Sequence, residues 1–180
     1  GAVFGVIGFG EIGQRAAALA KGIGMEVAAY DPFAGDTPDI AVSRNLEAIL
    51  KAADVVSLHC PLIPQTHHLI NAERLALMKP TAFLVNTARG AVVDEGALVA
   101  ALRSQLIAGA ALDSFETEPP DNDNPLWSLP NVIATPHVGG ASRSALRNMA
   151  VQSVEHIVVV LEGRGYDSRA LANKELVAAA

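Results

Sequence analysis

Short apolar runs alternate with longer segments of helical periodicity along this chain. The apolar runs are rich in β-branched residues and end at turn-forming or polar residues, which is typical of buried strands. We predict strands over 2–7, 25–30, 54–58, 81–86, about 107–112 and about 131–134, and helices over 12–23, 46–52, 94–104 and roughly 142–162. Strands that alternate with helices favour an α/β fold, a doubly wound parallel sheet between two helical layers.

The composition bounds the class of protein. The chain has 180 residues, of which 51% are hydrophobic and 18% charged. This length and hydrophobic fraction are sufficient for one domain with a buried hydrophobic core. A net charge of −6 without basic runs disfavours nucleic-acid binding. No apolar run approaches the length of a membrane span, so we expect no membrane contact. The single cysteine rules out an internal disulfide and agrees with a reducing compartment, so we expect a cytoplasmic protein.

A glycine-rich turn joins the first strand to the first helix. It reads Gly8-x-Gly10-x-x-Gly13, and Asp31 ends the next strand about twenty residues further on, which is the fingerprint of a Rossmann-type dinucleotide site. Gly8 allows the tight turn, Gly10 lets backbone approach a pyrophosphate, and Gly13 allows close helix packing. Asp31 would accept ribose hydroxyls and repel a 2′-phosphate, which favours NAD over NADP. The alternative is a plain strand–helix turn with a surface aspartate.

Three residues with suitable chemistry follow later strands. Arg89, Glu118 and His137 come after the fourth, fifth and sixth predicted strands, whose carboxyl ends border the ligand crevice of such a sheet. A guanidinium grips a carboxylate, an imidazole transfers protons near neutral pH, and a neighbouring carboxylate orients it. With a bound nicotinamide, this set suits interconversion of a 2-hydroxy acid and a 2-oxo acid. Taken singly, each residue is more often a surface or capping group.

Several motifs in order resemble one family. They are the glycine turn with Asp31, His59-Cys60-Pro61-Leu62, Asn86-Thr87-Ala88-Arg89-Gly90, Gly109–Asp113 with Glu118-Pro119, and Thr135-Pro136-His137-Val138-Gly139-Gly140. From residue 5 to about 162 the chain resembles the D-isomer-specific 2-hydroxyacid dehydrogenases, in particular the branch of phosphoglycerate dehydrogenase and the glyoxylate and hydroxypyruvate reductases. The resemblance implies that NAD is the cofactor, that the substrate is a small 2-hydroxy or 2-oxo acid, and that the protein is a homodimer.

The resemblance also implies roles. Arg89 would bind the substrate carboxylate, His137 would be the acid–base group, and Glu118 would be its carboxylate partner. Asp113 would hydrogen-bond the nicotinamide carboxamide. The implied cofactor contacts are Gly8, Gly10, Glu11, Ile12, Gly13, Tyr30, Asp31, Cys60, Pro61, Thr66, Thr87, Ala88, Arg89, Asp113, His137, Gly139 and Gly140.

The chain departs from the family at its start. Gly1 leads straight into a core strand, without Met and without the substrate domain that the family places first, so we expect a piece of a longer protein. We predict an NAD-binding domain over 1–162 and, over 163–180, a tail that returns to the substrate domain. The chain alone is then expected to be inactive. A non-catalytic NAD(H)-sensing or corepressor-like module of the same fold stays open as an alternative.

Histidines and the cysteine cluster in one stretch of the sequence. His59, Cys60, His67 and His68 fit no standard zinc spacing, so we predict no metal site. Cys60 is not expected to act as a nucleophile, because no activating base is evident in the sequence.

Overall fold

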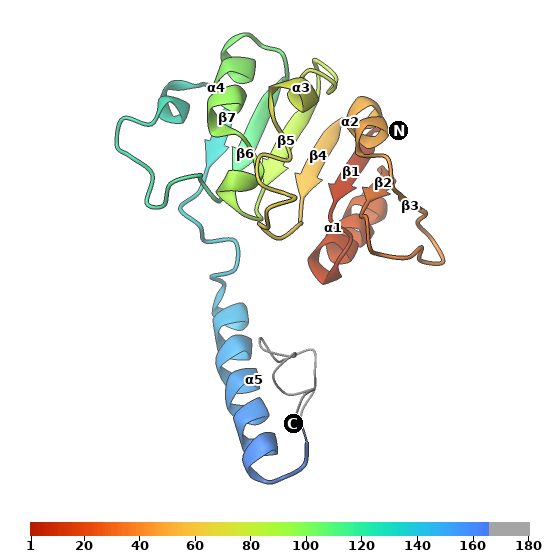
Figure 1. Cartoon of the computed structure of the whole chain (residues 1–180), viewed down its shortest axis with the longest axis vertical. Helices are drawn as coiled ribbons and strands as arrows, with labels where there is room; N and C mark the ends of the chain where they lie inside the picture. Colours follow the sequence, from red (N-terminus) through yellow and green to blue (C-terminus); the bar gives the residue numbers. More distant parts are fainter. Residues whose placement is uncertain (166–180) are drawn as a thin grey trace. The chain divides into compact units, whose positions relative to one another are not determined.

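The computed structural model describes residues 1–165, which divide into two compact units, Gly1–His137 and a second that begins at Val138. The first unit is an α/β fold around one parallel sheet (Figure 1). Its strands are β1 (Val3–Ile7), β2 (Glu26–Tyr30), β3 (Val42–Ser43), β4 (Val55–Leu58), β5 (Phe83–Asn86), β6 (Gly109–Leu112) and β7 (Val132–Ala134). Its helices are α1 (Glu11–Gly22), α2 (Leu46–Ala52), α3 (Ala72–Leu75) and α4 (Glu95–Arg103), with single 3₁₀ turns at Gly90–Val92 and Pro125–Ser128.

The predicted elements are confirmed, with ends that differ by two residues at most. Polar side chains cap two of these helices: that of Asn45 accepts from Ala48 N–H at the start of α2, and that of Asp94 from Ala97 N–H at the start of α4. The sequence did not indicate β3 or α3. Both are too short to show a period of two or of 3.6 residues.

The strand order defines the ligand edge of the sheet. The order is β3-β2-β1-β4-β5-β6-β7, and every neighbouring pair is parallel. The chain runs outward from β1 to β3, and then returns to the other side of β1 with β4. At this reversal the loops after β1 and β4 leave in opposite directions, which opens a crevice at their carboxyl ends. The sheet therefore confirms the doubly wound fold predicted from the sequence.

Neighbouring residues of β1 serve two separate cores. Ile7 belongs to a large cluster with Leu50 of α2 and Leu98 of α4, whereas Val6 belongs to a smaller cluster with Ala17 of α1. Successive side chains of a strand point to opposite faces, so α1 covers one face and the other helices cover the opposite one. This is the predicted three-layer arrangement. On the α1 face, Ile133 of β7 is 70% exposed.

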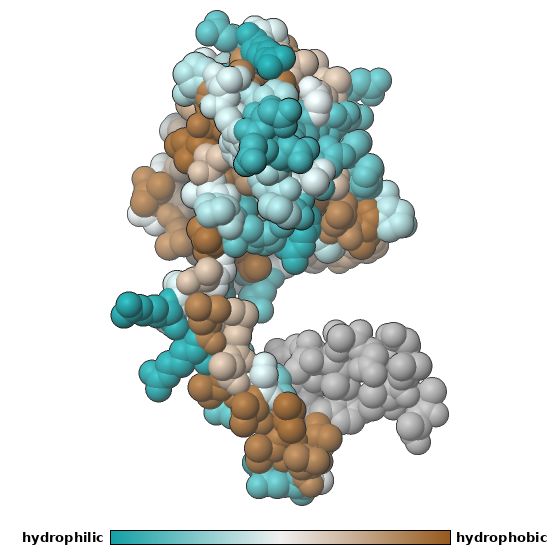
Figure 2. All heavy atoms as spheres, turned by 90° about the vertical axis from the view of Figure 1, so that its left-hand side faces the viewer, coloured by the Kyte–Doolittle hydropathy of each residue, from teal (hydrophilic) through white to brown (hydrophobic). Residues whose placement is uncertain are grey.

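The second unit contains the long helix α5 (Arg143–Leu161), which Ser142 caps by accepting from Ala145 N–H. None of the residues of α5 is buried, and its large apolar side chains form much of the brown surface of this unit (Figure 2). Within residues 1–165, no helix is long and apolar enough to cross a bilayer. Most of the predicted tail, 166–180, lies outside the described residues.

Candidate functional site

The three glycines of the turn have three different surroundings. Gly8 has a φ of +93°, and a Cβ there would lie 2.6 Å from the backbone nitrogen of Cys60. A Cβ on Gly13 would lie 2.1 Å from the carbonyl oxygen of Gly8. At Gly10 a Cβ would meet no described atom within 4 Å. Gly8 and Gly13 are therefore needed for the turn and the helix packing, while the space beside Gly10 is open for a ligand.

The beginning of α1 is suited to an anion. Its N-cap is Gly10, whose lack of a side chain leaves the first-turn N–H groups uncapped. The side chain of Glu11 pairs with Arg15 at 2.5 Å, away from the helix start, and Ile12 is exposed. Backbone N–H groups and the helix dipole together form a ready site for a pyrophosphate.

Asp31 closes the other side of this turn. Its Oδ2 accepts from Phe9 N–H at 2.8 Å, and its Oδ1 accepts from the N–H groups of Phe33 at 2.8 Å and Ala34 at 2.9 Å. Partial burial opposes ionisation, but these three donors outweigh it, so the pKa of Asp31 lies below its usual value. The carboxylate is thus charged, fixed in orientation and still able to accept a ribose hydroxyl.

Two adjoining pockets follow the carboxyl edge of the sheet. One has a volume of about 390 Å³ and the other about 620 Å³, and both are bordered by His59, Cys60 and Pro61. The first also contains Gly8, Gly10, Tyr30, Asp31 and Thr66, and the second Ile12, Thr87, Ala88 and Arg89. We call the two pockets together the cofactor groove. It assembles most of the residues that the sequence pointed to, and the open space at Gly10 and the charged Asp31 fit a dinucleotide.

Cys60 and His59 contribute walls to this groove rather than reactive groups. Burial raises the pKa of the Cys60 thiol to about 11, so it is a neutral thiol near neutral pH. Burial also lowers the pKa of His59, whose Nε2 lies 2.9 Å from the hydroxyl of Ser57. Neither residue has the properties of a nucleophile or a general acid.

Arg89 stands on a turn built by a buried asparagine. The side-chain amide of Asn86 donates to the carbonyl of Arg89 at 2.9 Å, and its oxygen accepts from Ala88 N–H at 3.1 Å. Gly90 follows, where a Cβ would lie 1.8 Å from the carbonyl carbon of Phe115. Asn86 and Gly90 were not among the predicted site residues. Their place in the motif was visible in the sequence, but the contact with Phe115 was not.

His137 and Glu118 form a hydrogen-bonded pair after β7 and β6. Nδ1 of His137 lies 2.8 Å from Oε2 of Glu118, and the other carboxylate oxygen accepts from Phe115 N–H at 3.0 Å. His137, this N–H and the charge of Arg89 all hold the pKa of Glu118 below its usual value. His137 has a φ of +54°, a left-handed conformation that is uncommon outside glycine and often marks functional sites.

The remaining predicted residues lie at the same strand ends or in the second unit. Asp113 is buried just after β6, where its Oδ1 accepts from the hydroxyl of Thr135 at 2.6 Å. Gly139 and Gly140 belong to the second unit and are described apart from the groove. The catalytic and cofactor-binding roles of the groove residues, of Glu118 and His137, and of Asp113 and the two glycines stay predictions.

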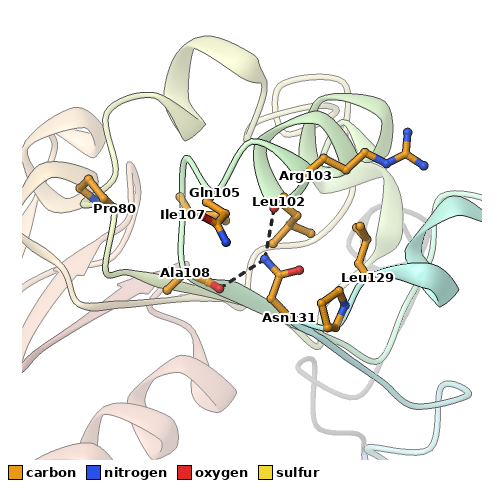
Figure 3. Close-up of a pocket in the computed structure, with 9 residues that line it drawn as sticks. Pro80, Leu102, Arg103, Gln105, Ile107, Ala108, Leu129 and Asn131 are labelled. Atoms are coloured by element: carbon orange, nitrogen blue, oxygen red, sulfur yellow. Dashed lines mark hydrogen bonds between the residues drawn. The ribbon is translucent and has the colours of Figure 1, made fainter.

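A further pocket of about 510 Å³ lies at the opposite edge of the sheet (Figure 3). Pro80, Ala108 and Asn131 border it, and they precede β5, β6 and β7. The amide of Asn131 donates to the carbonyls of Leu102 and Ala108, which ties the loop before β7 to α4 and β6. Ligands of open parallel sheets bind at the carboxyl edge, so this pocket is not the cofactor site.

The doubly wound sheet, the glycine turn and Asp31 together define a Rossmann-type domain that binds a dinucleotide. Residues 1–139 match the family described as D-isomer specific 2-hydroxyacid dehydrogenase, NAD binding domain, and the chain belongs to this family. NAD is accordingly the cofactor of the domain.

Relatives with similar sequences and structures belong to the same class of dehydrogenases. The chain is 43% identical over 167 residues to D-3-phosphoglycerate dehydrogenase of Methanocaldococcus jannaschii, covering 91% of this chain and 32% of the relative. It is 41% identical over 180 residues to glyoxylate reductase of Aeropyrum pernix, covering 98% and 53%. A D-isomer specific 2-hydroxyacid dehydrogenase from Lactobacillus delbrueckii, solved in an NAD-complexed form, matches with a TM-score of 0.83 and 35% identity, covering 90% of this chain and 53% of that one. The chain thus spans about a third to a half of these relatives.

Proposed function

We propose that the protein carrying this chain is an NAD-dependent D-2-hydroxyacid dehydrogenase that interconverts a small 2-hydroxy acid and its 2-oxo acid. The observation that carries the proposal is the hydrogen bond of 2.8 Å between His137 and Glu118, which orients an acid–base group close to the positive charge of Arg89. The relatives include a glyoxylate reductase and a phosphoglycerate dehydrogenase, whose names indicate small hydroxy or oxo acids.

The proposed chemistry divides between two atoms of the histidine ring. Nδ1 of His137 faces the carboxylate of Glu118, which leaves Nε2 for the substrate oxygen. A protonated ring then donates its proton to the carbonyl oxygen during reduction, and a neutral ring accepts the hydroxyl proton during oxidation. Glu118 sets the ring orientation through its contact with Nδ1. The nicotinamide cofactor, when bound, would accept the hydride as NAD⁺ or supply it as NADH.

Arg89 is the group we assign to the substrate carboxylate. Its guanidinium is exposed at the groove, and the one hydrogen bond described for it is a donation to the carbonyl oxygen of Ala88 at 2.7 Å. A planar guanidinium has further donors for a bidentate contact with a carboxylate. Glu11, Ile12, Asp31 and the other predicted groove residues are assigned to the pyrophosphate and the riboses.

Two measurements test the proposal in sequence. NADH fluorescence is first titrated with the 180-residue chain, with Asp31→Ala as the variant expected to bind more weakly. Hydride transfer from NADH is then followed at 340 nm with glyoxylate, hydroxypyruvate and 3-phosphohydroxypyruvate. This assay uses a longer form of the protein, with regions equivalent to those of the relatives that the 180 residues do not cover. His137→Asn, which keeps a residue tolerant of positive φ, is expected to reduce turnover by about a hundredfold or more.

The outcomes separate the two readings of the fold. Turnover that depends on His137 supports the dehydrogenase. NADH binding without turnover of any acid would favour the non-catalytic NAD(H)-sensing module instead. Unchanged turnover in His137→Asn would contradict the acid–base assignment.

We further propose a homodimer in the cytoplasm. We assign the contacts to α4 and the segment 116–130, where Trp127 is 43% exposed. Exposed aromatic side chains are typical of contact surfaces, and the single half-buried cysteine suits a reducing compartment. Light scattering after gel filtration tests the dimer, and Trp127→Ser should shift a real dimer toward monomer.

A further inference from the structure

Two histidines and a glutamate from distant parts of the sequence meet beside the cofactor groove without lining it. One ligand atom each from His67, His68 and Glu116 lies within 4.8 Å of the other two. Nε2 of His68 is 2.7 Å from Oε1 of Glu116, and the rings of His67 and His68 stack with their centroids 4.0 Å apart. We call these three side chains the His–His–Glu cluster.

The backbone on both sides of the cluster is held in place. His68 has a φ of +49°, and its N–H donates to the carbonyl of Ala91 at 2.8 Å. On the other side, Glu116 N–H donates to the carboxylate of Glu95 at 3.1 Å, and Glu95 N–H donates to the carboxylate of Glu116 at 3.3 Å. The cluster therefore does not depend on two free loops that happen to approach each other.

We propose that the His–His–Glu cluster is a binding site for a divalent transition-metal ion of the zinc type. Imidazole nitrogens and a carboxylate oxygen are the ligands that such ions take in proteins. A tetrahedral ion with bonds of about 2.0 Å holds its ligands about 3.3 Å apart. The distances in the cluster, from 2.7 Å to at most 4.8 Å, bracket that value. Because the two imidazole rings stack with 27° between their planes, one ring must turn out of the stack before a nitrogen of each ring faces the same ion.

The surroundings support an open site. His67 and Glu116 are exposed and His68 is half-buried, so water has access to the fourth coordination position. Ion binding replaces the hydrogen bond between His68 and Glu116 with two metal bonds. The ion joins the segment after β4, which contains the two histidines, to the segment after β6. In the second segment, Glu116 lies two residues before Glu118. The sequence pointed away from this site because forty-eight positions separate His68 from its carboxylate ligand.

The test is direct metal binding by the 180-residue chain. Co²⁺ is titrated in a non-chelating buffer and followed by its visible absorption, and Zn²⁺ is then added to displace it. We expect one strong site. His67→Gln, His68→Asn and Glu116→Gln should each weaken binding by at least the roughly 10–100-fold that follows loss of an outer partner of a metal ligand. Asparagine at position 68 tolerates the positive φ, and glutamine at 116 can still accept from Glu95 N–H.

Controls separate this site from other groups that bind metals. His156→Gln, on α5, should leave the affinity unchanged, and Glu118→Gln tests the rival pair with His137. Thiolate-to-cobalt absorption in the near ultraviolet would show that Cys60 is the ligand. That result, equal affinity in all the cluster variants, or no Co²⁺ binding by folded wild-type chain would each overturn the proposal. The assay needs neither NAD nor turnover, so its outcome is independent of the proposed dehydrogenase.

Discussion

Gly90 lies where the turn that carries Arg89 crosses the segment that carries Glu118. A Cβ at this position would lie 1.8 Å from the carbonyl carbon and 1.9 Å from the carbonyl oxygen of Phe115, and 2.4 Å from Glu116 N. Carbon atoms in contact are about 3.5 Å apart, so Gly90→Ala requires a backbone displacement of about 1.7 Å. Overpacking of this kind costs about 1–3 kcal/mol when side chains can yield. Here the obstacles are backbone atoms, so we expect about 3 kcal/mol or more.

The loss is measured by thermal unfolding of the 180-residue chain, with the fluorescence of Trp127 as the probe. Trp127 is the single tryptophan and packs edge-on against Phe115 at 5.2 Å between ring centroids, so it reports on the displaced segment. At about 3 °C per kcal/mol for a domain of this size, the midpoint should fall by about 10 °C.

Gly96→Ala is the matched control. Its Cβ would meet Asp94 Oδ1 at 3.5 Å, an ordinary contact, within α4. Alanine is the better helix former by about 0.5–1 kcal/mol, so this variant should melt slightly higher than wild type. A Gly90→Ala midpoint within about 2 °C of wild type would refute the steric reasoning. Because Phe115 N–H donates to Glu118, the same displacement should also lower turnover in an active form of the protein.

Three further expectations concern buried or charged groups. The buried hydroxyl of Ser114 has no hydrogen-bond partner among residues 1–165, so Ser114→Ala should raise the unfolding free energy by about 1 kcal/mol, whereas Ser57→Ala, which loses a bond to His59, should lower it. Because the pKa of Asp31 is lowered in the folded chain, its carboxylate contributes to the unfolding free energy. This contribution is fully present above the ordinary aspartate pKa and is lost as the pH falls through the lowered pKa. Between pH 6 and pH 3, the unfolding free energy measured in urea should therefore fall more for wild type than for Asp31→Asn. An equal fall in both proteins would contradict this. With a pKa of about 11, Cys60 should react with iodoacetamide near pH 8 roughly 100-fold more slowly in the folded chain than in urea.

Exposed apolar surface remains on both units of the described chain. Ile133 on the sheet and Leu161 on α5 are 70% and 80% exposed. Large contiguous apolar surface commonly marks a contact with other protein.

Local patterns were sufficient for most of the fold. Buried parallel strands are continuous apolar runs, caps such as Asn45 and Asp94 mark helix starts, and the glycine turn has fixed spacing. Each of these signals lies within a few residues of the element that it predicts. The sequence also identified Arg89, Glu118 and His137 as candidates, since each follows a strand whose carboxyl end borders the ligand crevice.

The tertiary structure decided what depends on pairs of residues far apart in the chain. The sequence alone determined the fold class, the cofactor turn and the order of the site motifs, because these follow from local periodicity and spacing. Only the folded chain showed that His137 bonds to Glu118, that Gly90 passes against Phe115, and that Glu116 meets two histidines. A one-dimensional pattern contains the residue types for these contacts, but the distances between them arise from the packing of loops at the sheet edge.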